Sequence, residues 1–485
     1  MGVPFIKLFE FWGKYYAFDV NTDEIINISK KLYFYLGKLL KNHDGDINFD
    51  DEDTRREYES YNAYGYFSDI KVREIKHPST DLIEGYLNRK INMMTLQVTQ
   101  NCNLRCSYCV YSDFYNSGQR THTGKRMAIE TALKAVDFLA EHSLDSEFVS
   151  ITFYGGEPLL EMNLVKKVVE YAEKVFKGKE LRFSVTTNAT KLDEEIVEYL
   201  VKKDFVLMIS LDGPKEIHNT NRRFAADGKG SYDIIVSNLR KIKEKFPDYF
   251  RKISISMVID PQNDFDEINS VFDKGSVFSE LNVHATVIDD IYSLEKVSYS
   301  EEYIAKREYH SFLAYLAELD RINIGEISPI AYEEISDMKS KSKMKGKVKK
   351  LSYTDAPGGP CIPGQTRLFV DVDGNLFPCE RVSESSPAMI IGNLKEGFFY
   401  ENARKILNIG ALTADECKNC WAFRRCNLCA RNADDGSKLS REKKLTYCSG
   451  VRERTLYELK REVLFYEAKC HKERNGYGKC SDLSV

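Results

Sequence analysis

From Met94 onward, short runs rich in β-branched and aromatic residues alternate with stretches whose apolar residues recur at helical spacing. The short runs are TLQVT, SITFY, LRFSVTT, FVLMISL, ISISMVI and NVHATVI, and the helical stretches include MAIETALKAVDFLAEH and NLVKKVVEYAEKVF. Strands separated by helices of this length predict a parallel sheet with right-handed crossovers, and therefore an α/β fold. Six strands are too few for the eight-stranded barrel, so the pattern favours an open or partial (β/α)6 barrel.

The regions on either side of these repeats have other patterns. Residues Ile6 to Leu39 predict a short hairpin that turns at Asn21-Thr22-Asp23, followed by a helix, which together form a small α+β module. Between Lys339 and Lys350 the sequence KSKSKMKGKVKK contains seven lysines in twelve residues. This run is typical of a solvated linker, with a grip on an acidic partner as the alternative. We therefore divide the chain into residues 1–90, 91–335, 336–355 and 356–485.

Composition narrows the classes of function. With 485 residues, 42% hydrophobic and 30% charged, the chain is typical of a globular protein of two or three domains. Its net charge of −4 provides no overall basic field, so we do not expect nucleic acid as a partner. No signal sequence and no uncharged apolar window of about 18 residues occurs, so we expect a cytoplasmic protein without a membrane partner. Twelve cysteines are too sparse for a disulfide scaffold, and clustered thiols in a reducing compartment favour metal.

Polar residues follow the ends of four successive predicted strands. Cys102 comes after the first strand, Gly155-Gly156-Glu157-Pro158 after the second, Asn188 after the third and Asp212 after the fourth. In sheets of parallel strands, ligands bind at the carboxyl ends. The sequence therefore predicts a site at this edge, although a Gly-Gly turn, an Asn helix cap and a strand ending in a turn would each explain one of these segments alone.

Three thiols lie on one loop within TQNCNLRCSYCVY, at Cys102, Cys106 and Cys109. Structural zinc needs four protein ligands, and the nearest imidazole, His122, lies thirteen residues beyond Cys109 without a second ligand pair. A four-iron cluster can be held by three cysteines if its fourth iron is left for a small molecule. The spacing also differs from the bacterial ferredoxin run. The loop therefore favours an iron-sulfur cluster over zinc.

The segment CNLRCSYC resembles the Cys-x3-Cys-x2-Cys signature of radical SAM enzymes, whose open iron binds S-adenosylmethionine (SAM). The resemblance implies a partial (β/α)6 barrel with Cys102, Cys106 and Cys109 as the catalytic cluster ligands. YGGEP is similar to the family's GGE motif, which implies that Glu157 contacts the SAM amino group while the glycines allow close backbone approach. TTNAT and SLDGP resemble its ribose-binding segments. The resemblance implies that Tyr108 contacts the adenine of SAM and that Arg222, rather than its neighbour Arg223, binds the SAM carboxylate. The other SAM contacts that it implies are Gly155, Gly156, Asn188, Ser210 and Asp212.

The cysteines beyond the lysine-rich run resemble the SPASM extension of radical SAM enzymes, which binds two auxiliary four-iron clusters. The segments are CIPGQTRLFVDVDGNLFPCERV and CKNCWAFRRCNLC, followed by Cys448. The resemblance implies three [4Fe–4S] clusters in all, with one auxiliary cluster on Cys417, Cys420, Cys426 and Cys448 and the other on Cys361, Cys379 and Cys429. The usual pattern ends Cys-x3-Cys, whereas Cys426 and Cys429 have two residues between them. Two zinc-ribbon sites are the alternative, and Cys470 and Cys480 are free thiols or an eighth ligand.

The amino-terminal module looks like the winged-helix-like peptide-recognition domain of maturases of ribosomally made peptides, which bind a leader segment as an added strand. Together these segments resemble the ranthipeptide maturases, which form thioethers from a cysteine sulfur to a side-chain carbon in a Cys-rich precursor peptide. The resemblance implies a 5′-deoxyadenosyl radical, an auxiliary cluster that accepts one electron and an open iron that binds the substrate thiolate. It also implies an external one-electron reductant of flavodoxin or ferredoxin type. Other radical SAM peptide maturases that form an α-carbon thioether or a carbon–carbon crosslink, an anaerobic sulfatase-maturing enzyme and a non-catalytic cluster-bearing scaffold are the alternatives.

Overall fold

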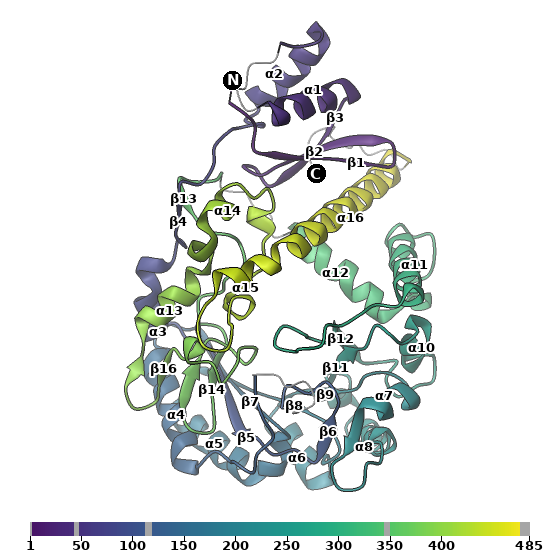
Figure 1. The fold of residues 1–485 in the computed structure, drawn as a ribbon. Coiled ribbons are helices and arrows are strands. Elements are labelled where there is room, and N and C mark those ends of the chain that lie inside the picture. Colours follow the sequence, from purple (N-terminus) through teal and green to yellow (C-terminus); the bar gives the residue numbers. More distant parts are fainter. Residues whose placement is uncertain (1, 43–47, 112–118, 344–349, 476–485) are drawn as a thin grey trace.

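The computed structural model describes residues 2–42, 48–111, 119–343 and 350–475, with only the backbone of 337, 339–343 and 468–475 (Figure 1). The six predicted strands are present and pair side by side in chain order, all parallel. They are β5 (Met93–Thr99), β7 (Phe148–Gly155), β8 (Glu180–Thr187), β9 (Val206–Ser210), β11 (Ser254–Ile259) and β12 (Asn282–Val287). The α/β fold predicted from hydrophobic alternation is therefore confirmed.

The two faces of this sheet differ in polarity. One face carries buried apolar residues such as Leu96, Ile151 and Ile209, and helices cover it (Figure 1). Truncating such a core residue to alanine costs about 2–5 kcal/mol of unfolding free energy. Hydroxyls are frequent on the other face, where Thr152 and Ser184 share a hydrogen bond of 2.7 Å. The covering helices are α4 (Ile129–His142), α5 (Met162–Val175), α6 (Glu194–Lys202) and α8 (Tyr232–Lys245).

The carboxyl-terminal part extends the same sheet, which the sequence patterns did not predict. Strand β14 (Leu368–Val370) pairs in parallel with β5 at its outer edge, so that one hydrogen-bonded sheet joins two regions far apart in the chain. Asp371 then turns the chain, because its carboxylate accepts the amide protons of Asp373 and Asn375 at 3.0 and 2.8 Å. Three antiparallel strands follow: β15 (Asn375–Phe377), β16 (Gly392–Asn393) and β17 (Gly397–Phe398).

The amino-terminal module is a three-stranded meander with two helices. The predicted turn at residues 21–23 joins β2 (Lys14–Asp19) to β3 (Glu24–Ile28). An additional strand, β1 (Ile6–Phe11), pairs with β2 through Trp12 and Gly13, whose φ angles of 51° and 72° match a tight hairpin turn. The helices are α1 (Lys30–Lys41), capped by the Ser29 hydroxyl, and α2 (Glu52–Ala63), capped by the Asp51 carboxylate.

The meander packs on both of its faces. One face lies against α1 and α2, with Ala17, Ile26 and Leu36 in the shared core. The other face packs Phe9 and Phe18 against the cysteine-rich part of the chain, in a core that also contains residues of the last helix. Two arginines fix this contact: Arg424 donates to the carbonyls of residues 20 and 21, and Arg425 forms an ion pair of 2.7 Å with Asp23. The module is therefore seated on the cysteine-rich part.

The last helix, α16 (Cys448–Asn475), connects several parts of the molecule (Figure 1). It begins at a predicted cluster ligand, and Leu464 and Phe465 pack against α11 (Glu301–Glu318) and α12 (Pro329–Lys343). Arg461 donates to the Tyr315 hydroxyl at 3.0 Å and pairs with Glu334 at 3.2 Å. In the part of the chain that the structure describes, no helix is both long and apolar enough to cross a bilayer.

Two predicted boundaries differ from the structure. Helix α12 continues to Lys343, within the predicted linker 336–355, because lysine is a good helix former; residues 344–349 lie outside the described residues. Strand β4 (Glu74–Ile75), assigned to the amino-terminal part, pairs with β13 (Thr354–Asp355), which lies at the end of the predicted linker. The other elements are α3 (Ile83–Arg89), β6 (Leu104–Cys106), α7 (Lys215–Asn221), β10 (Arg222–Phe224), α9 (Pro247–Phe250), α10 (Phe265–Asn269), α13 (Tyr400–Leu407), α14 (Ala414–Lys418) and α15 (Arg441–Thr446).

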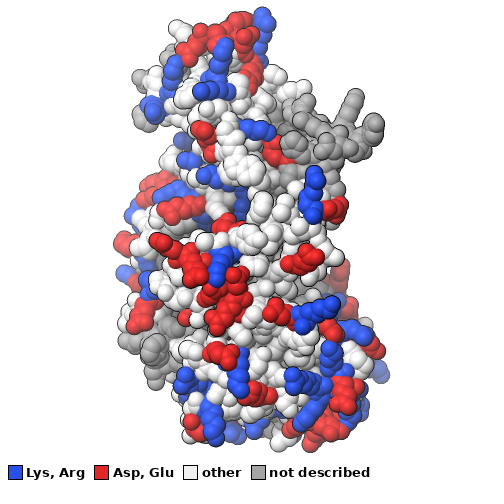
Figure 2. All heavy atoms as spheres, turned by 90° about the vertical axis from the view of Figure 1, so that its right-hand side faces the viewer, with Lys and Arg blue, Asp and Glu red and all other residues white. Residues whose placement is uncertain are grey.

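The surface carries both signs of charge. On the face drawn in Figure 2, lysine and arginine side chains are interspersed with aspartate and glutamate. This distribution agrees with the small net charge of −4. Electrostatic attraction by one large field is therefore not a feature of this face.

Candidate iron-sulfur and SAM site

The first cysteine loop, defined here by Cys102, Cys106 and Cys109, begins directly after β5. Its thiols share one electrostatic environment, because, beside the effect of burial, Cys109 acts on the pKa of Cys102 and of Cys106, and Cys102 acts on that of Cys106. Burial is the main effect on all of them: it raises the pKa of Cys102 to about 12 and raises the pKa of Cys106 and Cys109 as well. Cations close to the loop oppose this rise. Arg222 has this effect at Cys106 and at Cys109.

A short two-stranded ribbon carries the predicted carboxylate-binding arginine to this loop. Strand β10 pairs antiparallel with β6, which places Arg222 opposite Cys106. The Arg222 guanidinium is buried, donates from Nε to the Asp212 carboxylate at 2.9 Å and lies over the Tyr108 ring at 5.5 Å. Tyr108 also donates its hydroxyl to Asp212. The structure thus brings three predicted SAM contacts together, whereas Arg223 is exposed and donates to the carbonyl of residue 219.

The two glycines of the GGE segment lie against the cysteine loop itself. A Cβ atom on Gly155, whose φ is +140°, would lie 2.2 Å from the Thr99 carbonyl oxygen, and one on Gly156 would lie 2.1 Å from the Asn101 carbonyl oxygen. Backbone hydrogen bonds of 2.9 Å join the same segments. The close approach predicted for a ligand is therefore made, in this structure, to the protein's own backbone.

The Glu157 carboxylate is buried and already has several protein partners. It accepts the amide protons of Leu159 and Asn188 at 3.0 and 2.8 Å and the Thr187 hydroxyl at 2.7 Å. Burial raises its pKa, and these donors oppose the rise. Glu157 thus joins the ends of β7 and β8. A carboxylate can accept more hydrogen bonds than these, so the predicted contact with the SAM amino group would use a lone pair that the three protein donors leave free.

The two remaining predicted contacts lie at the ends of β8 and β9. Asn188 is buried, and its amide donates to the Asn103 side chain at 2.8 Å and lies 3.8 Å from the Cys102 sulfur. Ser210 ends β9, two residues before Asp212, and faces Ser256 in the register with β11. All of the predicted site residues of the radical SAM part thus lie at the carboxyl ends of parallel strands or on the adjoining β6–β10 ribbon.

His218 joins this network, although its sequence position gave no signal for a role. Its ring is fully buried, accepts the Asp212 amide proton at Nδ1 over 3.3 Å and bonds the Ser231 hydroxyl through Nε2 at 2.9 Å. Burial, and secondarily the Arg222 charge, lowers the pKa of His218 to about 4. The imidazole is therefore neutral near pH 7 and holds the Asp212 backbone in place.

Electrostatic interactions between thiols occur within each of the two predicted sets of carboxyl-terminal cysteines. In the three-cysteine group, burial raises the pKa of Cys379 and of Cys429; Cys429 adds to the rise at Cys379, and Cys361, which is exposed, adds to the rise at Cys429. The four-cysteine group consists of Cys417, Cys420, Cys426 and Cys448. Burial raises the pKa of the last three, Cys417 adds to each rise, and Cys420 adds to those of Cys426 and Cys448. The side chain of Cys470 and all of Cys480 lie outside the described residues.

A buried ion pair joins the first cysteine loop to the carboxyl-terminal part, and nothing in the sequence indicated it. Arg120 pairs with Glu384 through its Nε, and their side chains are 1% and 10% exposed. The guanidinium lies 4.8 Å from the centre of the Phe369 ring of β14. Gln97 of β5 donates to Glu384 at 2.6 Å and to the Tyr111 hydroxyl at 2.9 Å. This network lies between the segment that follows Cys109 and the segment that follows Cys379.

These donor sets suit iron-sulfur clusters. Thiolates are the protein ligands of such clusters, and nearby cations offset the negative charge of the assembly. The structure supplies both, with arginines at the first cysteine loop and a buried lysine, Lys444, at the four-cysteine group. Within the described ranges, no group of three His, Cys, Asp or Glu side chains could hold a single metal ion. A single metal ion needs its ligands to converge on one point, whereas in an iron-sulfur cluster each thiolate binds its own iron.

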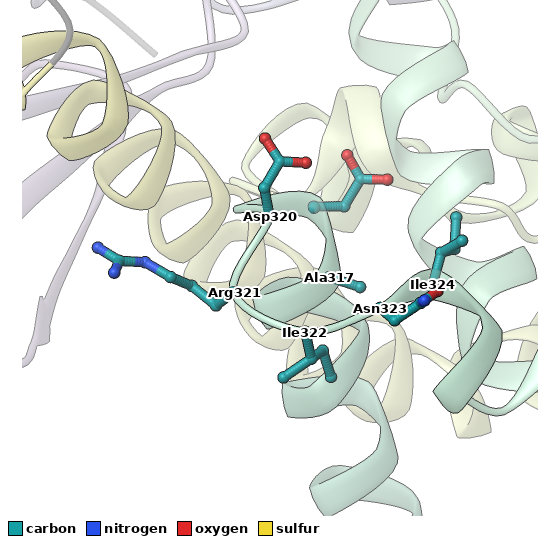
Figure 3. Close-up of a pocket in the computed structure, with 7 residues that line it drawn as sticks. Ala317, Asp320, Arg321, Ile322, Asn323 and Ile324 are labelled. Atoms are coloured by element: carbon teal, nitrogen blue, oxygen red, sulfur yellow. The ribbon is translucent and has the colours of Figure 1, made fainter.

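Two hollows of the surface lie away from these residues. Figure 3 shows one of about 630 Å³ at the end of α11, lined by residues from Ala317 to Ile324. Another, of about 670 Å³, lies beside α8 and includes Tyr232, Arg240 and Phe278. Neither contains a predicted site residue. The candidate site is therefore defined by convergent side chains at the strand ends.

Comparison with known families agrees with this geometry. Residues 96–274 match the family model described as the Radical SAM superfamily. This segment includes the first cysteine loop, the strand-end residues from Gly155 to Asp212 and the arginine of β10. Residues 96–274 therefore form a radical SAM domain. Such a domain implies a [4Fe–4S] cluster and SAM as cofactors.

Curated relatives include sulfatase-maturating enzymes. The cysteine-type anaerobic sulfatase-maturating enzyme of Clostridium novyi (strain NT) is 25% identical over 375 residues, which are 71% of this chain and 89% of that enzyme. The enzyme of the same description from Clostridium perfringens (strain ATCC 13124) is 26% identical over 377 residues, or 75% and 95%. The radical SAM cyclopropyl synthase TigE of Paramaledivibacter caminithermalis is 28% identical over 213 residues, or 38% and 44%. The chain thus contains a radical SAM domain and is similar to sulfatase-maturating enzymes over most of its length.

Solved structures share the fold. The structure described as "Native anSMEcpe with bound AdoMet" superposes with a TM-score of 0.54 at 22% identity, covering 76% of this chain and 99% of that one. The same protein with bound AdoMet and Cp18Cys peptide gives a TM-score of 0.54 at 21% identity, with coverage of 76% and 99%. At this identity the likeness concerns the fold.

Proposed function

We propose that this enzyme forms thioether crosslinks in a ribosomally made, Cys-rich precursor peptide, joining a cysteine sulfur to a side-chain carbon. In this proposal the first cysteine loop holds the cluster that works with SAM, and the three- and four-cysteine groups form a SPASM domain with two auxiliary [4Fe–4S] clusters. These cofactors supply radical chemistry and electron transfer. The chain supplies the binding, the orientation and the exclusion of water that this chemistry needs.

The observation that carries the proposal is the composition of the three-cysteine group. Three thiolates leave one iron of a four-iron cluster without a protein ligand. Cys361 is exposed, so this site is accessible from outside, whereas Cys417 of the four-cysteine group is buried. A substrate thiolate is a suitable fourth ligand, since thiolates are the usual partners of such iron. Binding it there would hold the sulfur in place for bond formation.

Side chains around the first cysteine loop have clear roles in this proposal. Asp212 fixes the Nε edge of Arg222 and orients Tyr108, which leaves the far edge of the guanidinium for a carboxylate such as that of SAM. The neutral His218 holds the Asp212 backbone. Because Arg222 and Asp212 are buried, water is kept from this pair and its geometry is fixed before a ligand binds.

The amino-terminal meander offers a place for a leader segment. In the described chain, no backbone partner pairs with the outer edge of β1, whereas on β3 the Asn27 carbonyl accepts the Tyr61 hydroxyl at 2.8 Å. An extended peptide can add to an open edge as a further strand. The exposed side chains of Trp12 and Phe34 lie on the same module, and they offer apolar contacts. We assign the leader to β1 and the reducing electron to an external flavodoxin or ferredoxin.

Co-expression with the short, Cys-rich reading frames of its own genome tests this function. The expected product has lost two hydrogen atoms per crosslink, retains all of its sulfur and cannot be alkylated at the cysteine. Fragmentation in tandem mass spectrometry then distinguishes a side-chain linkage from an α-carbon linkage or a carbon–carbon bond. Peptides that stay unmodified although the enzyme cleaves SAM would contradict the proposal.

Sulfatase maturation is the second candidate, because two curated relatives of that description align with 71% and 75% of this chain. The Cp18Cys peptide bound by the structural relative is a direct probe for it. A sulfatase-maturing activity would remove sulfur from the cysteine of this peptide and add oxygen. Turnover of this peptide without a leader would favour the second candidate over the first.

A further inference from the structure

Lys444 of α15 is a buried cation without an acidic partner. Lys444 is 2% exposed, and its ammonium donates to the Thr413 hydroxyl at 2.5 Å. No Asp or Glu of the described chain forms an ion pair with it; the nearby Glu416 pairs with Arg441 instead. Burying an unpaired ammonium is energetically unfavourable. Some other negative group must therefore compensate Lys444.

The four-cysteine group is the neighbour that can provide this charge. Lys444 Nζ lies 3.7 Å from the sulfur of Cys417, and the Thr413 hydroxyl lies 3.2 Å from the same sulfur. Cys448, four residues after Lys444, approaches the Lys444 carbonyl through its sulfur at 3.9 Å. The thiols of Cys426 and Cys448 also experience the ammonium charge. Lys444 is thus anchored among the ligands of one predicted cluster.

The three-cysteine group has different surroundings. Glu380 follows Cys379 directly and its carboxylate acts against ionisation of that thiol, while Arg367 pairs with Glu380 at 2.6 Å. Arg367 also acts at Cys379, and Arg431 and Arg381 act at Cys429, so acidic and basic groups both surround the three-cysteine group. Among the main influences on the thiols of the four-cysteine group, Lys444 and Arg452 are basic and none is acidic. The net charge around a cluster and the hydrogen bonds to its sulfurs set its reduction potential.

We propose that Lys444 is a fixed positive charge that raises the reduction potential of a [4Fe–4S] cluster held by Cys417, Cys420, Cys426 and Cys448. Reduction adds one negative charge to a buried site, and a nearby ammonium stabilises the reduced form more than the oxidised form. Thr413 keeps the ammonium against the Cys417 sulfur. Lys444 therefore acts through the cluster: it holds a positive charge at a fixed place beside the cluster and does not contact the substrate. This inference rests on the proposed function, which assigns the cluster to these cysteines.

A redox titration of the anaerobically reconstituted full chain tests this effect of Lys444 on the reduction potential. Dithionite is the reductant, and electron paramagnetic resonance (EPR) monitors the clusters. In Lys444→Met, we expect the midpoint of one cluster to move to a lower potential while the other clusters keep theirs. Lys444→Arg retains the charge and is the matched control, with a midpoint near the wild-type value. An unchanged midpoint in Lys444→Met at wild-type iron content would overturn the inference and leave the proposed function intact.

A second measurement on the wild type does not depend on how the variant folds. Enzyme labelled with ¹⁵N-lysine is reduced and examined by electron-nuclear double resonance. We expect a lysine nitrogen coupled to a reduced cluster, and loss of this coupling in Lys444→Arg. A reduced four-cysteine cluster without any lysine coupling would overturn the inference. Wild-type iron content of only about four per chain would instead reject the auxiliary clusters of the proposed function, and with them this inference.

Discussion

The first cysteine loop and the four-cysteine group both gather thiols, but their surroundings differ. The first cysteine loop lies at the ends of parallel strands, among polar side chains already bonded to one another, such as Asp212 and Arg222. The four-cysteine group lies against an apolar cluster that includes Leu428 and Val451, with Lys444 as a buried charge. Three thiols at strand ends suit a cluster that binds a small molecule, and four thiols, which leave no open iron, suit one that only exchanges electrons. In the account proposed here, the three-cysteine group has an intermediate position, since it leaves an iron open beside the exposed Cys361 but belongs to the electron-transfer part.

The largest expected effect is a complete loss of thioether formation without loss of SAM cleavage, which would separate the three-cysteine group from the first cysteine loop. Replacing Cys361 (Cys361→Ala) removes a ligand of the exposed three-cysteine group while leaving the first cysteine loop unchanged. We expect SAM cleavage, measured as 5′-deoxyadenosine released, to remain, and thioether formation, measured by mass spectrometry of the peptide, to be lost. Crosslinking that survives in this variant would remove the reason for giving the group an essential role.

Parts of this comparison were predictable from sequence, for physical reasons. The six parallel strands have buried apolar residues at a period of two, and the cysteines occur at fixed spacings, so both were readable along the chain. Strands such as β14 have three residues, too short for a pattern. Arg120 and Glu384 lie 264 residues apart, and their pairing depends on β14 joining β5. Lys443 and Lys444 are adjacent lysines, and only the packing of α15 decides which is buried.

The joint between the first cysteine loop and the carboxyl-terminal part can be broken at Arg120. Replacement by methionine (Arg120→Met) leaves Glu384 buried without its cation, and we expect a loss of about 3–5 kcal/mol in unfolding free energy. The control is Arg89→Met, which removes an exposed, solvent-screened pair with Asp145 and should cost far less. Urea denaturation of both variants measures the difference. Equal costs would mean that the buried pair does not hold the two parts together.

The packing of the first cysteine loop against the GGE segment is tested at Gly156. A Cβ there would lie 2.1 Å from the Asn101 carbonyl oxygen, so Gly156→Ala must displace the loop. We expect a destabilisation of about 1–3 kcal/mol and a lower iron content. Gly124→Ala is the matched control, since its Cβ would meet no atom within 4 Å. Iron content equal to the control would contradict the tight packing described here.

The last effect concerns the pH dependence of stability and is spread over more than two pH units. Burial lowers the pKa of His218 to about 4 in the folded protein, whereas an unfolded histidine titrates near pH 6.5. Below about pH 6.5 the unfolded chain binds this proton and the folded chain does not, so stability falls toward pH 4, by at most about 1.4 kcal/mol per pH unit. Denaturant titrations between these pH values measure the slope. His218→Gln should reduce it, and an unchanged slope would show that His218 is not the group responsible.

The central claim, that the carboxyl-terminal cysteines hold clusters in addition to the one of the radical SAM domain, is tested most directly by iron and sulfide analysis. The wild type and the triple variant Cys102→Ala/Cys106→Ala/Cys109→Ala are compared after anaerobic reconstitution. The account predicts about twelve irons per chain in the wild type and about eight in the variant. About four irons falling to nearly none, with zinc bound instead, would contradict it, because the carboxyl-terminal cysteines would then have a structural role.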